Sequence, residues 1–359
     1  MALHAPARRS APRIRERPTT CPLSRVRLTH LLAVTSSVLA LVGAGAAGTA
    51  KRRTGAPVAP TLVASQIEDS TKTGAVGPGA TGPRVVRAQI LLDRAGFSPG
   101  EIDGVHGDDF AVAVKGYQEN HGLKPTGTID AEMWALLNAD AGPLLLTYTI
   151  TTMDVKGPFQ PIPADTQEKA KMKWLGFETP QEGLGEKFHS APALLAELNP
   201  GKELNTPGER ITVPNLRRAV RRMASRVVVS KSKRTVIAYG AGDKQLAQYP
   251  ATIGDTHDPL PIGDWTVTGV RHYPWFSYDP DHFWNSSPKQ AKAMLPPGPN
   301  NPAGVAWIGL SKEHYGIHGT PDPGHIRHGE SAGCVRMTNW DVSALSQMVR
   351  RGTPVSLEE

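Results

Sequence analysis

The last third of the chain consists of short segments rich in β-branched residues separated by turn residues, and this pattern restricts the fold more than any other feature. RVVVS and RTVIAYG lie within residues 226–240, and KQLAQYPATIG and PLPIGDWTVTGV follow within residues 244–270. Gly-Asp and Pro-Gly turn signals separate such segments. The pattern predicts a mostly-β, sandwich or barrel-like domain over residues 221–359 rather than repeated βαβ units. A closing helix is expected from about Asn339, with the following residues facing inward: Val342, Leu345, Met348 and Val349.

The positive charge of the chain is concentrated at its N-terminus. Residues 1–50 contain seven arginines and one acidic residue, Glu16, for a net charge of +6. The remaining 309 residues carry 33 basic and 32 acidic side chains, for a net charge of +1. A nucleic-acid-binding protein would carry its basic footprint on the folded part. We therefore expect no nucleic-acid partner.

The same N-terminal region has the order of a secretory signal. The arginines end at Arg27, and LTHLLAVTSSVLALVGAGAAGTA follows as an apolar run that ends in small residues. Cleavage after Ala46 or Ala50 is one expectation. An uncleaved anchor is the other, because Leu28 to Ala47 is close to the ~20 residues that span a bilayer. In both cases the rest of the chain is exported, to the periplasm or cell envelope.

The number and positions of the cysteines bear on the expected export of the chain. The chain has two cysteines, Cys21 in the leader and Cys334 near the C-terminus. If the leader is removed, Cys21 goes with it, and if the leader stays, Cys21 lies on the cytoplasmic side. In both cases Cys334 is the one thiol in an oxidising compartment, so no structural disulfide is expected. Such a thiol is either a small buried hydrophobe or a reactive group.

Two further segments precede the β-rich region. Residues 51–82 are rich in Gly, Ala, Pro and Thr without periodicity, which predicts a flexible tether. Residues 83–140 predict three helices: one that stops at Gly96, one from Asp108 to about His121, and one capped by Asp130. Buried positions are expected on these helices at Val85, Val86, Ile90, Leu91, Phe110, Val114, Tyr117, Met133, Trp134 and Leu137.

The helical segment has a characteristic set of turn and aromatic residues: Asp103-Gly104, Gly107, Tyr117-Gln118, Gly122-Leu123, Thr126-Gly127, Asp130 and Trp134. With these residues the segment resembles the peptidoglycan-binding domain found at the ends of many cell-wall enzymes. The resemblance implies binding of wall glycan or peptide. The same glycines and aromatic residues also suit turns and a core, so the motif defines the fold more than a groove.

Residues 141–220 predict a small α+β spacer. LLTYTIT suggests a strand, Leu194, Leu195 and Leu198 share a helical face, and ERITVP returns as a strand after the break at Asn199-Pro200-Gly201. The second half resembles a LysM glycan-binding module, whereas the first half matches poorly. A plain spacer that packs on the catalytic domain is the alternative.

The sequence around Cys334 has the elements of nucleophilic catalysis. His318 precedes it by sixteen residues in YGIHGTPDPGHIRHGESAGCVRM, and a cysteine nucleophile needs a base or a cation beside it. Gly333 lets a substrate carbonyl approach and frees the backbone to direct N–H groups at an oxyanion. Arg336 is expected on the same side as Cys334, because residues two apart in a strand share a face. It could bind a substrate carboxylate.

IHGT followed by SAGCVRM resembles the signature of the YkuD-type L,D-transpeptidase catalytic domain. The resemblance extends over roughly the last 130 residues, through YPATIG, PLPIGDWTV and PPGPNNPAGVAWIGLSKEHYGIHGT. It implies that Cys334 is the nucleophile and His318 the proton donor and acceptor. Oxyanion and positioning roles are implied for Gly333, Ser331 and Gly319, and substrate binding for Arg336 and Tyr315. Many relatives have His directly before Gly-Cys, where this chain has Ala332, which puts a second imidazole in doubt.

The implied reaction is attack of the thiolate on the third residue of a peptidoglycan stem tetrapeptide. D-Alanine leaves, and an amine then takes the thioester to form a cross-link. Acylation by carbapenems is expected, and no cofactor is required. The acceptor stays open between a second stem, a protein lysine and water. Water would make the chain an L,D-carboxypeptidase or amidase-type hydrolase, and a non-catalytic wall-binding protein is a further alternative.

Two features of the catalytic region have competing interpretations. His314 and His318 have a chelating spacing, but it falls across a strand and turn without an acidic residue at a zincin-like position, so no metal is expected. His325 and His328 are expected to be solvated loop residues. The aromatic-rich insertion at residues 271–294 is either a lid or acceptor wall over the site, or a surface hairpin.

Overall fold

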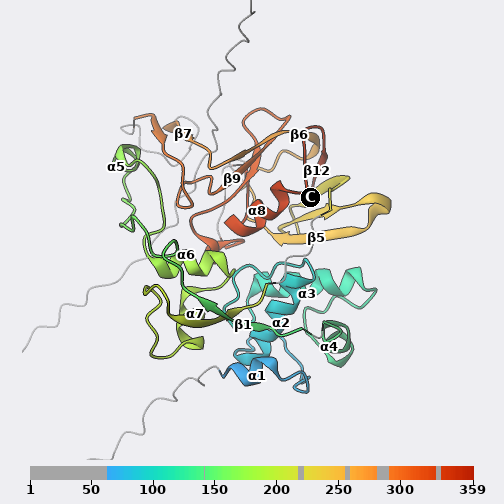
Figure 1. The fold of residues 1–359 in the computed structure, drawn as a ribbon. Coiled ribbons are helices and arrows are strands. Elements are labelled where there is room, and N and C mark those ends of the chain that lie inside the picture. Colours follow the sequence, from blue (N-terminus) through green and yellow to red (C-terminus); the bar gives the residue numbers. More distant parts are fainter. Residues whose placement is uncertain (1–62, 141, 217–221, 255–258, 281–290, 329–332) are drawn as a thin grey trace, which may run out of the picture.

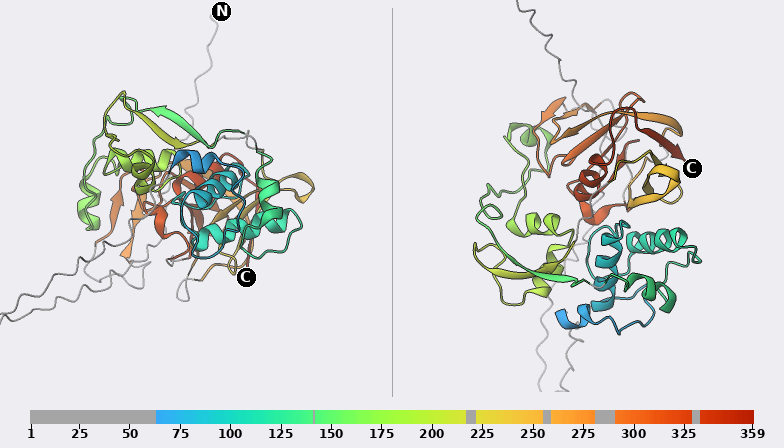
Figure 2. Two further views of the ribbon diagram at one scale, coloured as in Figure 1. Left: turned by 90° about the horizontal axis from the view of Figure 1, so that it is seen from below. Right: turned by 45° about the vertical axis from the view of Figure 1, so that its right-hand side comes forward.

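The computed structural model describes residues 63–140, 142–216, 222–254, 259–280, 291–328 and 333–359. Along the chain these residues form a helical module, an α+β spacer and a sheet domain. Figures 1 and 2 show the module and the spacer side by side, both against the sheet domain. Within the described residues no helix is both long and apolar enough to cross a membrane.

The helical module contains α1 (Ala64–Glu68), α2 (Pro83–Arg94), α3 (Asp108–Asn120) and α4 (Ala131–Leu137). Pro83 occupies the first helical turn of α2, where no amide hydrogen bond is lost. The Asp130 side chain accepts a hydrogen bond from the amide of Met133 and so caps α4, as expected. The buried positions expected from the sequence are confirmed, and Trp134 and Phe110 are among the largest fully buried side chains.

The ordered part of the module begins before residue 83. Residues 63–82, assigned to the tether from their composition, contain α1 and a β-bridge between Val76 and Ile129. Ile67 and Val76 are buried in the module core. The tether prediction is therefore wrong for this stretch, and its residues 51–62 lie outside the described residues.

The spacer pairs β1 (Leu145–Thr149) with β2 (Arg210–Pro214) in an antiparallel ladder. Between them lie α5 (Thr166–Lys171), α6 (Pro180–Lys187) and α7 (Pro192–Leu198). Leu194, Leu195 and Leu198 are buried, in agreement with the expected apolar face. The LysM-like assignment stays a prediction.

The sheet domain confirms the mostly-β expectation. Its strands and helix are β3 (Arg226–Ser230), β4 (Thr235–Tyr239), β5 (Gln245–Pro250), β6 (Gly263–His272), β7 (Phe276–Tyr278), β8 (Ala293–Leu295), β9 (Ala306–Leu310), β10 (Gly316–His318), β11 (Val335–Arg336), α8 (Asn339–Ser346) and β12 (Pro354–Glu358). Two short 3₁₀ helices are η1 (Ala241–Asp243) and η3 (Pro323–His325). One sheet has the strand order β11-β10-β9-β6-β12-β3-β4-β5, and β7 pairs with β8 separately.

The two edges of the eight-stranded sheet meet. Thr252, two residues after β5, and Arg336 of β11 exchange backbone hydrogen bonds of 2.8 and 2.9 Å. The sheet therefore curls into the barrel-like form of the two expected architectures. Inside the curl α8 packs against β9, and its Val342 and Leu345 are buried with the strand residues (Figure 1). The Thr338 side chain caps this helix by accepting from the amide of Asp341.

The helical module is bound directly to the sheet domain. The backbone N–H of Gln248 in β5 donates a hydrogen bond to the carbonyl of Gly96, and the backbone carbonyl of Gln248 accepts one from the N–H of Ser98. The Ser98 hydroxyl lies 2.8 Å from the carboxylate of Asp341 at the start of α8. These buried contacts join residues that are about 150 or more positions apart in the sequence.

Candidate active site

Three neighbouring strands bring three functional side chains into one row. In the ladder β9–β10–β11, Trp307 lies opposite His318, and His318 lies opposite Arg336. Residues paired across adjacent strands point to the same face of a sheet. The rings of Trp307 and His318 stack with centroids 5.4 Å apart and planes inclined by 15°. The histidine is therefore held between an aromatic wall and a guanidinium.

Cys334 lies at the entrance to this row. It precedes Arg336 by two residues, directly before β11, and its side chain is buried in one apolar cluster with Trp307, Leu175, Phe276 and others. Its Sγ lies 3.7 Å from the carbonyl oxygen of His314. The sequence analysis expected Cys334 and Arg336 on the same side because residues two apart in a strand share a face, and their positions before and at the end of β11 agree with this.

One expectation about Cys334 is contradicted. The structure has its sulfur in a disulfide, whereas the sequence analysis expected a thiol. That expectation rested on the separation of Cys334 from Cys21, either by removal of the leader or by its retention on the cytoplasmic side, and Cys21 lies outside the described residues. A disulfide sulfur cannot act as a nucleophile, so chemistry at this position requires the reduced form.

Gly333 is required by the backbone at this point. Its φ is +86°, a left-handed conformation that favours glycine. A Cβ there would lie 2.6 Å from Cε1 of the Tyr315 ring. Tyr315 is half-buried at the turn between β9 and β10, and its ring therefore fixes the approach to Cys334 from that side.

His318 is poised as a neutral base. Its Nδ1 donates to the carbonyl oxygen of Gly319 over 2.7 Å, because a carbonyl can only accept. The lone pair of the neutral ring then lies on Nε2, which has no hydrogen-bond partner in the described part of the chain. Burial, with the nearby charge of Arg336, lowers the pKa of His318 to about 3.

This environment makes a prediction about pH. In a Cys334→Ala variant, imidazole ¹⁵N resonances should show His318 still neutral at pH 5, with a short histidine-containing peptide as the reference. The unfolded chain binds a proton near pH 6.5 that the folded chain lacks, so the contribution of His318 to stability falls as pH falls from about 6.5 towards 3. A His318 that protonates above pH 6 would contradict the prediction.

Arg336 completes the row as a largely enclosed cation. Its Nε and Nη2 are enclosed and have no hydrogen-bond partner among the described residues. Burial lowers the pKa of the guanidinium and the charge of Asp322 opposes this, but arginine stays charged. Enclosed donors without partners are rare because each costs about 1–3 kcal/mol. The geometry therefore suits an anionic or carbonyl ligand beside His318.

Gly319 positions His318 through its carbonyl. Its N–H donates to the carbonyls of Ala303 and Ala306, over 3.0 and 3.3 Å. That N–H is therefore used within the fold, and the positioning part of the expected role fits better than oxyanion binding. Ser331, the remaining expected oxyanion residue, lies outside the described residues.

Asn339 was missed by the sequence analysis. Its Oδ1 accepts from the amide of Val305 and packs where Cβ atoms at Gly304 and Gly319 would lie, and its Nδ2 donates to Glu186 over 3.0 Å. It therefore ties the spacer helix α6 to the backbone that holds His318. This role depends on the packing of α8 against the turn at Gly304, and no local sequence pattern around Asn339 predicts it.

The remaining histidines lie apart from the row. His325 is exposed and its Nδ1 lies 2.8 Å from Asp322, and His328 is also exposed. In the described residues no three His, Cys, Asp or Glu side chains are grouped as metal ligands. The described part of the insertion is the β7–β8 hairpin, whose Phe276, Tyr278 and Leu295 pack in the cluster with Cys334. Its residues 281–290 are not described, so the lid stays a prediction.

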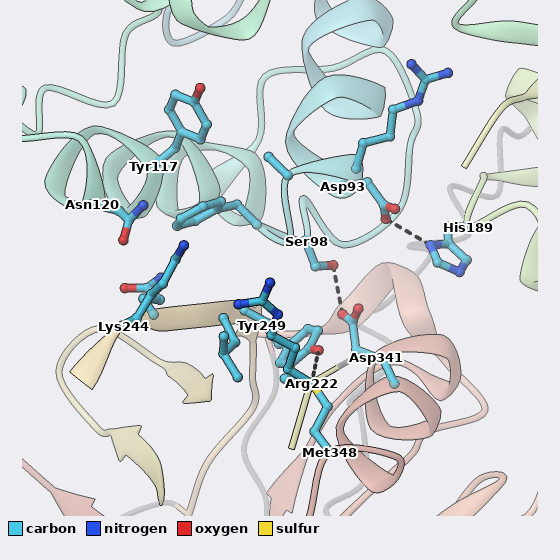
Figure 3. Close-up of a pocket in the computed structure, with 18 of the residues that line it drawn as sticks. Asp93, Ser98, Tyr117, Asn120, His189, Arg222, Lys244, Tyr249, Asp341 and Met348 are labelled. Carbon is cyan, nitrogen blue, oxygen red and sulfur yellow. Dashed lines mark hydrogen bonds and ion pairs between the residues drawn. The ribbon is translucent and has the colours of Figure 1, made fainter. Parts of the chain in front are cut away.

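A cavity of about 500 Å³ lies at a distance from this chemistry, where the module, the spacer and the sheet domain meet (Figure 3). Figure 3 shows Ser98 bound to Asp341, and Asp93 bound to His189 over 2.8 Å. Neither Cys334 nor His318 nor Arg336 lines it. We therefore place the candidate active site at the β9–β10–β11 row.

Comparison with known proteins agrees with this geometry. Residues 224–357 match the family model of the L,D-transpeptidase catalytic domain, and residues 81–137 match a putative peptidoglycan binding domain. The putative L,D-transpeptidase YkuD of Bacillus licheniformis is 31% identical over 180 residues, covering 49% of this chain and 92% of that protein. Its Bacillus subtilis counterpart is 28% identical over 171 residues, covering 47% and 88%.

Among solved structures, an L,D-transpeptidase from Xylanimonas cellulosilytica is 16% identical and covers 84% of this chain and all of that one, with a TM-score of 0.36. A likeness at this level adds no argument. The relation to the Bacillus licheniformis protein, which this chain covers almost completely, is sufficient by itself. The chain therefore belongs to the family of YkuD-type L,D-transpeptidases.

Proposed function

We propose that the chain is a cysteine-dependent acyltransferase that joins peptidoglycan stems through a thioester on Cys334. The observation that carries this proposal is the row next to Cys334, in which His318 Nε2 and the Nε and Nη2 of Arg336 have no hydrogen-bond partner among the described residues. A base without a partner and an anion-binding cation are the groups that acyl transfer by a thiol needs.

In the first step His318 Nε2 takes the proton from the reduced Cys334 thiol. Sulfur attacks the carbonyl carbon of the third stem residue and forms a C–S bond. The backbone N–H of Cys334, aimed by the turn at Gly333, stabilises the oxyanion. The C–N bond to the terminal D-alanine breaks, and His318 returns the proton to the leaving amine. Arg336 holds a substrate carboxylate during this step.

In the second step an amine from a neighbouring stem attacks the thioester and gives its proton to His318. The C–S bond breaks, an amide forms and the thiol is restored. Because one imidazole serves both half-reactions, its neutral state in the resting protein suits the role. Export to the cell envelope belongs to the same proposal, since the substrate polymer lies there.

The proposal is tested by mass spectrometry of the reduced, purified protein. Mixing with a carbapenem should add the mass of one drug molecule, and Cys334→Ala should abolish the adduct. Incubation with disaccharide tetrapeptide should then give a cross-linked dimer that lacks one D-alanine. His318→Asn should bind wall sacculi as the parent does but form no dimer.

Two other results would indicate a different function for the chain. An adduct with release of trimmed tripeptide alone would identify a hydrolase that uses water as acceptor. Binding to sacculi with neither adduct nor turnover would identify a wall-binding protein and would overturn the catalytic proposal.

A further inference from the structure

A second cavity, of about 470 Å³, lies between the spacer and the sheet domain. We call it the junction groove. Its aromatic lining comes from both sides: Phe159, Trp174 and Phe177 from the spacer, and Tyr273 and Trp340 from the sheet domain. Concave sites with several aromatic side chains and a few polar groups are typical ligand-binding sites.

Two of these aromatic side chains form an exposed platform. Trp174 is 40% exposed and Tyr273 is 48% exposed, although both are large rings. Their centroids lie 5.3 Å apart with planes inclined by 44°. Adjacent exposed rings from two parts of a chain form an apolar patch rimmed by polar groups, which marks a binding surface.

The backbone holds this platform at some cost. Tyr273 has φ +47°, which is unfavourable for a bulky residue, and its amide donates to the carbonyl of Val305 over 2.8 Å. Strain of this kind concentrates at ligand-binding sites. On the other side a Cβ at Gly176 would lie 2.9 Å from the Trp174 ring, so glycine there lets the ring lie flat over the backbone.

The inner wall of the groove contains an unsatisfied donor. Trp340 is 7% exposed and stacks on His189 with centroids 5.2 Å apart. Its Nε1 has no hydrogen-bond partner within the described ranges. Asn339 and Glu186, hydrogen-bonded to each other, lie in the same wall. The indole N–H is enclosed, and both Nδ2 protons of Asn339 are already donated, to Glu186 and to the carbonyl of Pro299. This side of the groove therefore offers a polar ligand the carboxyl of Glu186, with Lys187 and Ser343 beside it in the lining.

The groove is close to neutral at physiological pH. Asp154 and Lys187 form an ion pair of 2.8 Å, and Asp154 also accepts from Tyr148 and Thr151. Burial raises the pKa of Glu186 to about 8, so this carboxyl is mostly protonated at pH 7. No other acidic or basic side chain lines the groove within the described residues. An uncharged ligand fits it better than a stem peptide, which carries carboxylates.

We propose that the junction groove binds a saccharide, with one sugar ring stacked on Trp174 and Tyr273 and its hydroxyl and acetamido groups bound by Glu186, Lys187 and Ser343. A pyranose has apolar C–H faces that suit the negative face of an aromatic ring and a polar rim that suits the wall. The identification of this saccharide with the glycan strand of the wall rests on the proposed function.

The groove lies close to the segments that carry the candidate active-site residues. Leu175, next to Trp174, packs in the cluster that contains Trp307 and Cys334. Asn339 both lines the groove and packs against Gly319, the residue that holds His318. A sugar in the groove would therefore contact residues that pack directly against the segments carrying Cys334 and His318, and it would hold the attached stem in the same part of the molecule.

The test uses the full-length protein and chitotetraose, an uncharged chain of N-acetylglucosamine, with binding measured by calorimetry. Trp174→Ala and Tyr273→Ala should each weaken binding by about tenfold. Trp174→Phe should retain most of it. Trp275→Ala is the matched control, because Trp275 is 51% exposed but does not line the groove. It should bind as the parent does, and thermal unfolding should confirm that every variant is folded.

The outcomes separate this inference from the proposed function. The sugar should bind equally well in a Cys334→Ala background, where no chemistry occurs. Carbapenem acylation should keep its parental rate in Trp174→Ala, while KM rises for disaccharide tetrapeptide and not for free tetrapeptide. Parental chitotetraose binding in both alanine variants would overturn the inference and place the sugar site elsewhere, for instance on the helical module. Loss of free tetrapeptide binding instead would assign the groove to peptide.

Discussion

A His318→Asn variant should fold as the parent does and lose about a thousandfold in kcat/KM for cross-linking of disaccharide tetrapeptide. The asparagine amide can still donate to the carbonyl of Gly319, which His318 Nδ1 reaches over 2.7 Å. It offers no lone pair of comparable basicity at the position of Nε2. Proton transfer from Cys334, to D-alanine and from the acceptor amine would therefore all lose their carrier.

The measurement is steady-state kinetics with product analysis, beside circular dichroism and thermal unfolding. Asparagine was chosen because an alanine here would leave the Gly319 carbonyl without its donor and would confuse a folding defect with a chemical one. His325→Asn, at an exposed position, is the control and should keep parental kinetics. A His318→Asn variant with kcat/KM close to the parental value would exclude His318 as the general base.

The second large effect concerns stability. Gly304→Ala should lower the free energy of unfolding of the sheet domain by about 3 kcal/mol or more. Gly304 has φ +60°, and a Cβ there would lie 2.7 Å from the carbonyl carbon of Gly319 and would strike Oδ1 of Asn339. Neither neighbour can yield, since one is backbone and the other is bound to Val305 and Glu186.

Urea denaturation followed by tryptophan fluorescence measures this effect. Gly352→Ala is the matched control: it also has positive φ, +88°, in the same domain, but its Cβ would meet nothing within 4 Å. It should cost only about 1 kcal/mol, the backbone share of the penalty. Equal losses in the two variants would show that contact with Gly319 and Asn339 contributes nothing.

Local signals in the sequence predicted much of the fold. The helix that starts at Asp108, the cap at Asp130 and the β-branched strands of the sheet domain all depend on neighbouring residues. The error over residues 63–82 has a physical cause. Composition favoured a tether, but two isolated apolar residues, Ile67 and Val76, are buried by contacts with distant helices.

The arrangement of the candidate site could be predicted only in part from local sequence signals. The motif indicated Cys334, His318 and Arg336, but the parallel pairing that sets His318 opposite Arg336 depends on the curl of the whole sheet. The Gly319 N–H donates to carbonyls 16 and 13 positions earlier in the chain, and Asn339 accepts from an amide 34 positions earlier. These contacts depend on how the strands are connected and have no local sequence signal. The junction groove required the spacer and the sheet domain together.

Leu175 of the spacer and Cys334 of the sheet domain share one apolar cluster, and this has a consequence for how such a chain can evolve. A catalytic domain whose active-site core is formed entirely by its own residues can recombine with other domains as an independent unit. Here the sheet domain is open on the side of the spacer, so recombination at residue 221 would remove Leu175 from the cluster that contains Phe276 and Leu295 and would leave Cys334 without part of its enclosure. Spacer and catalytic unit must therefore be inherited together, and substitutions in one constrain those tolerated in the other.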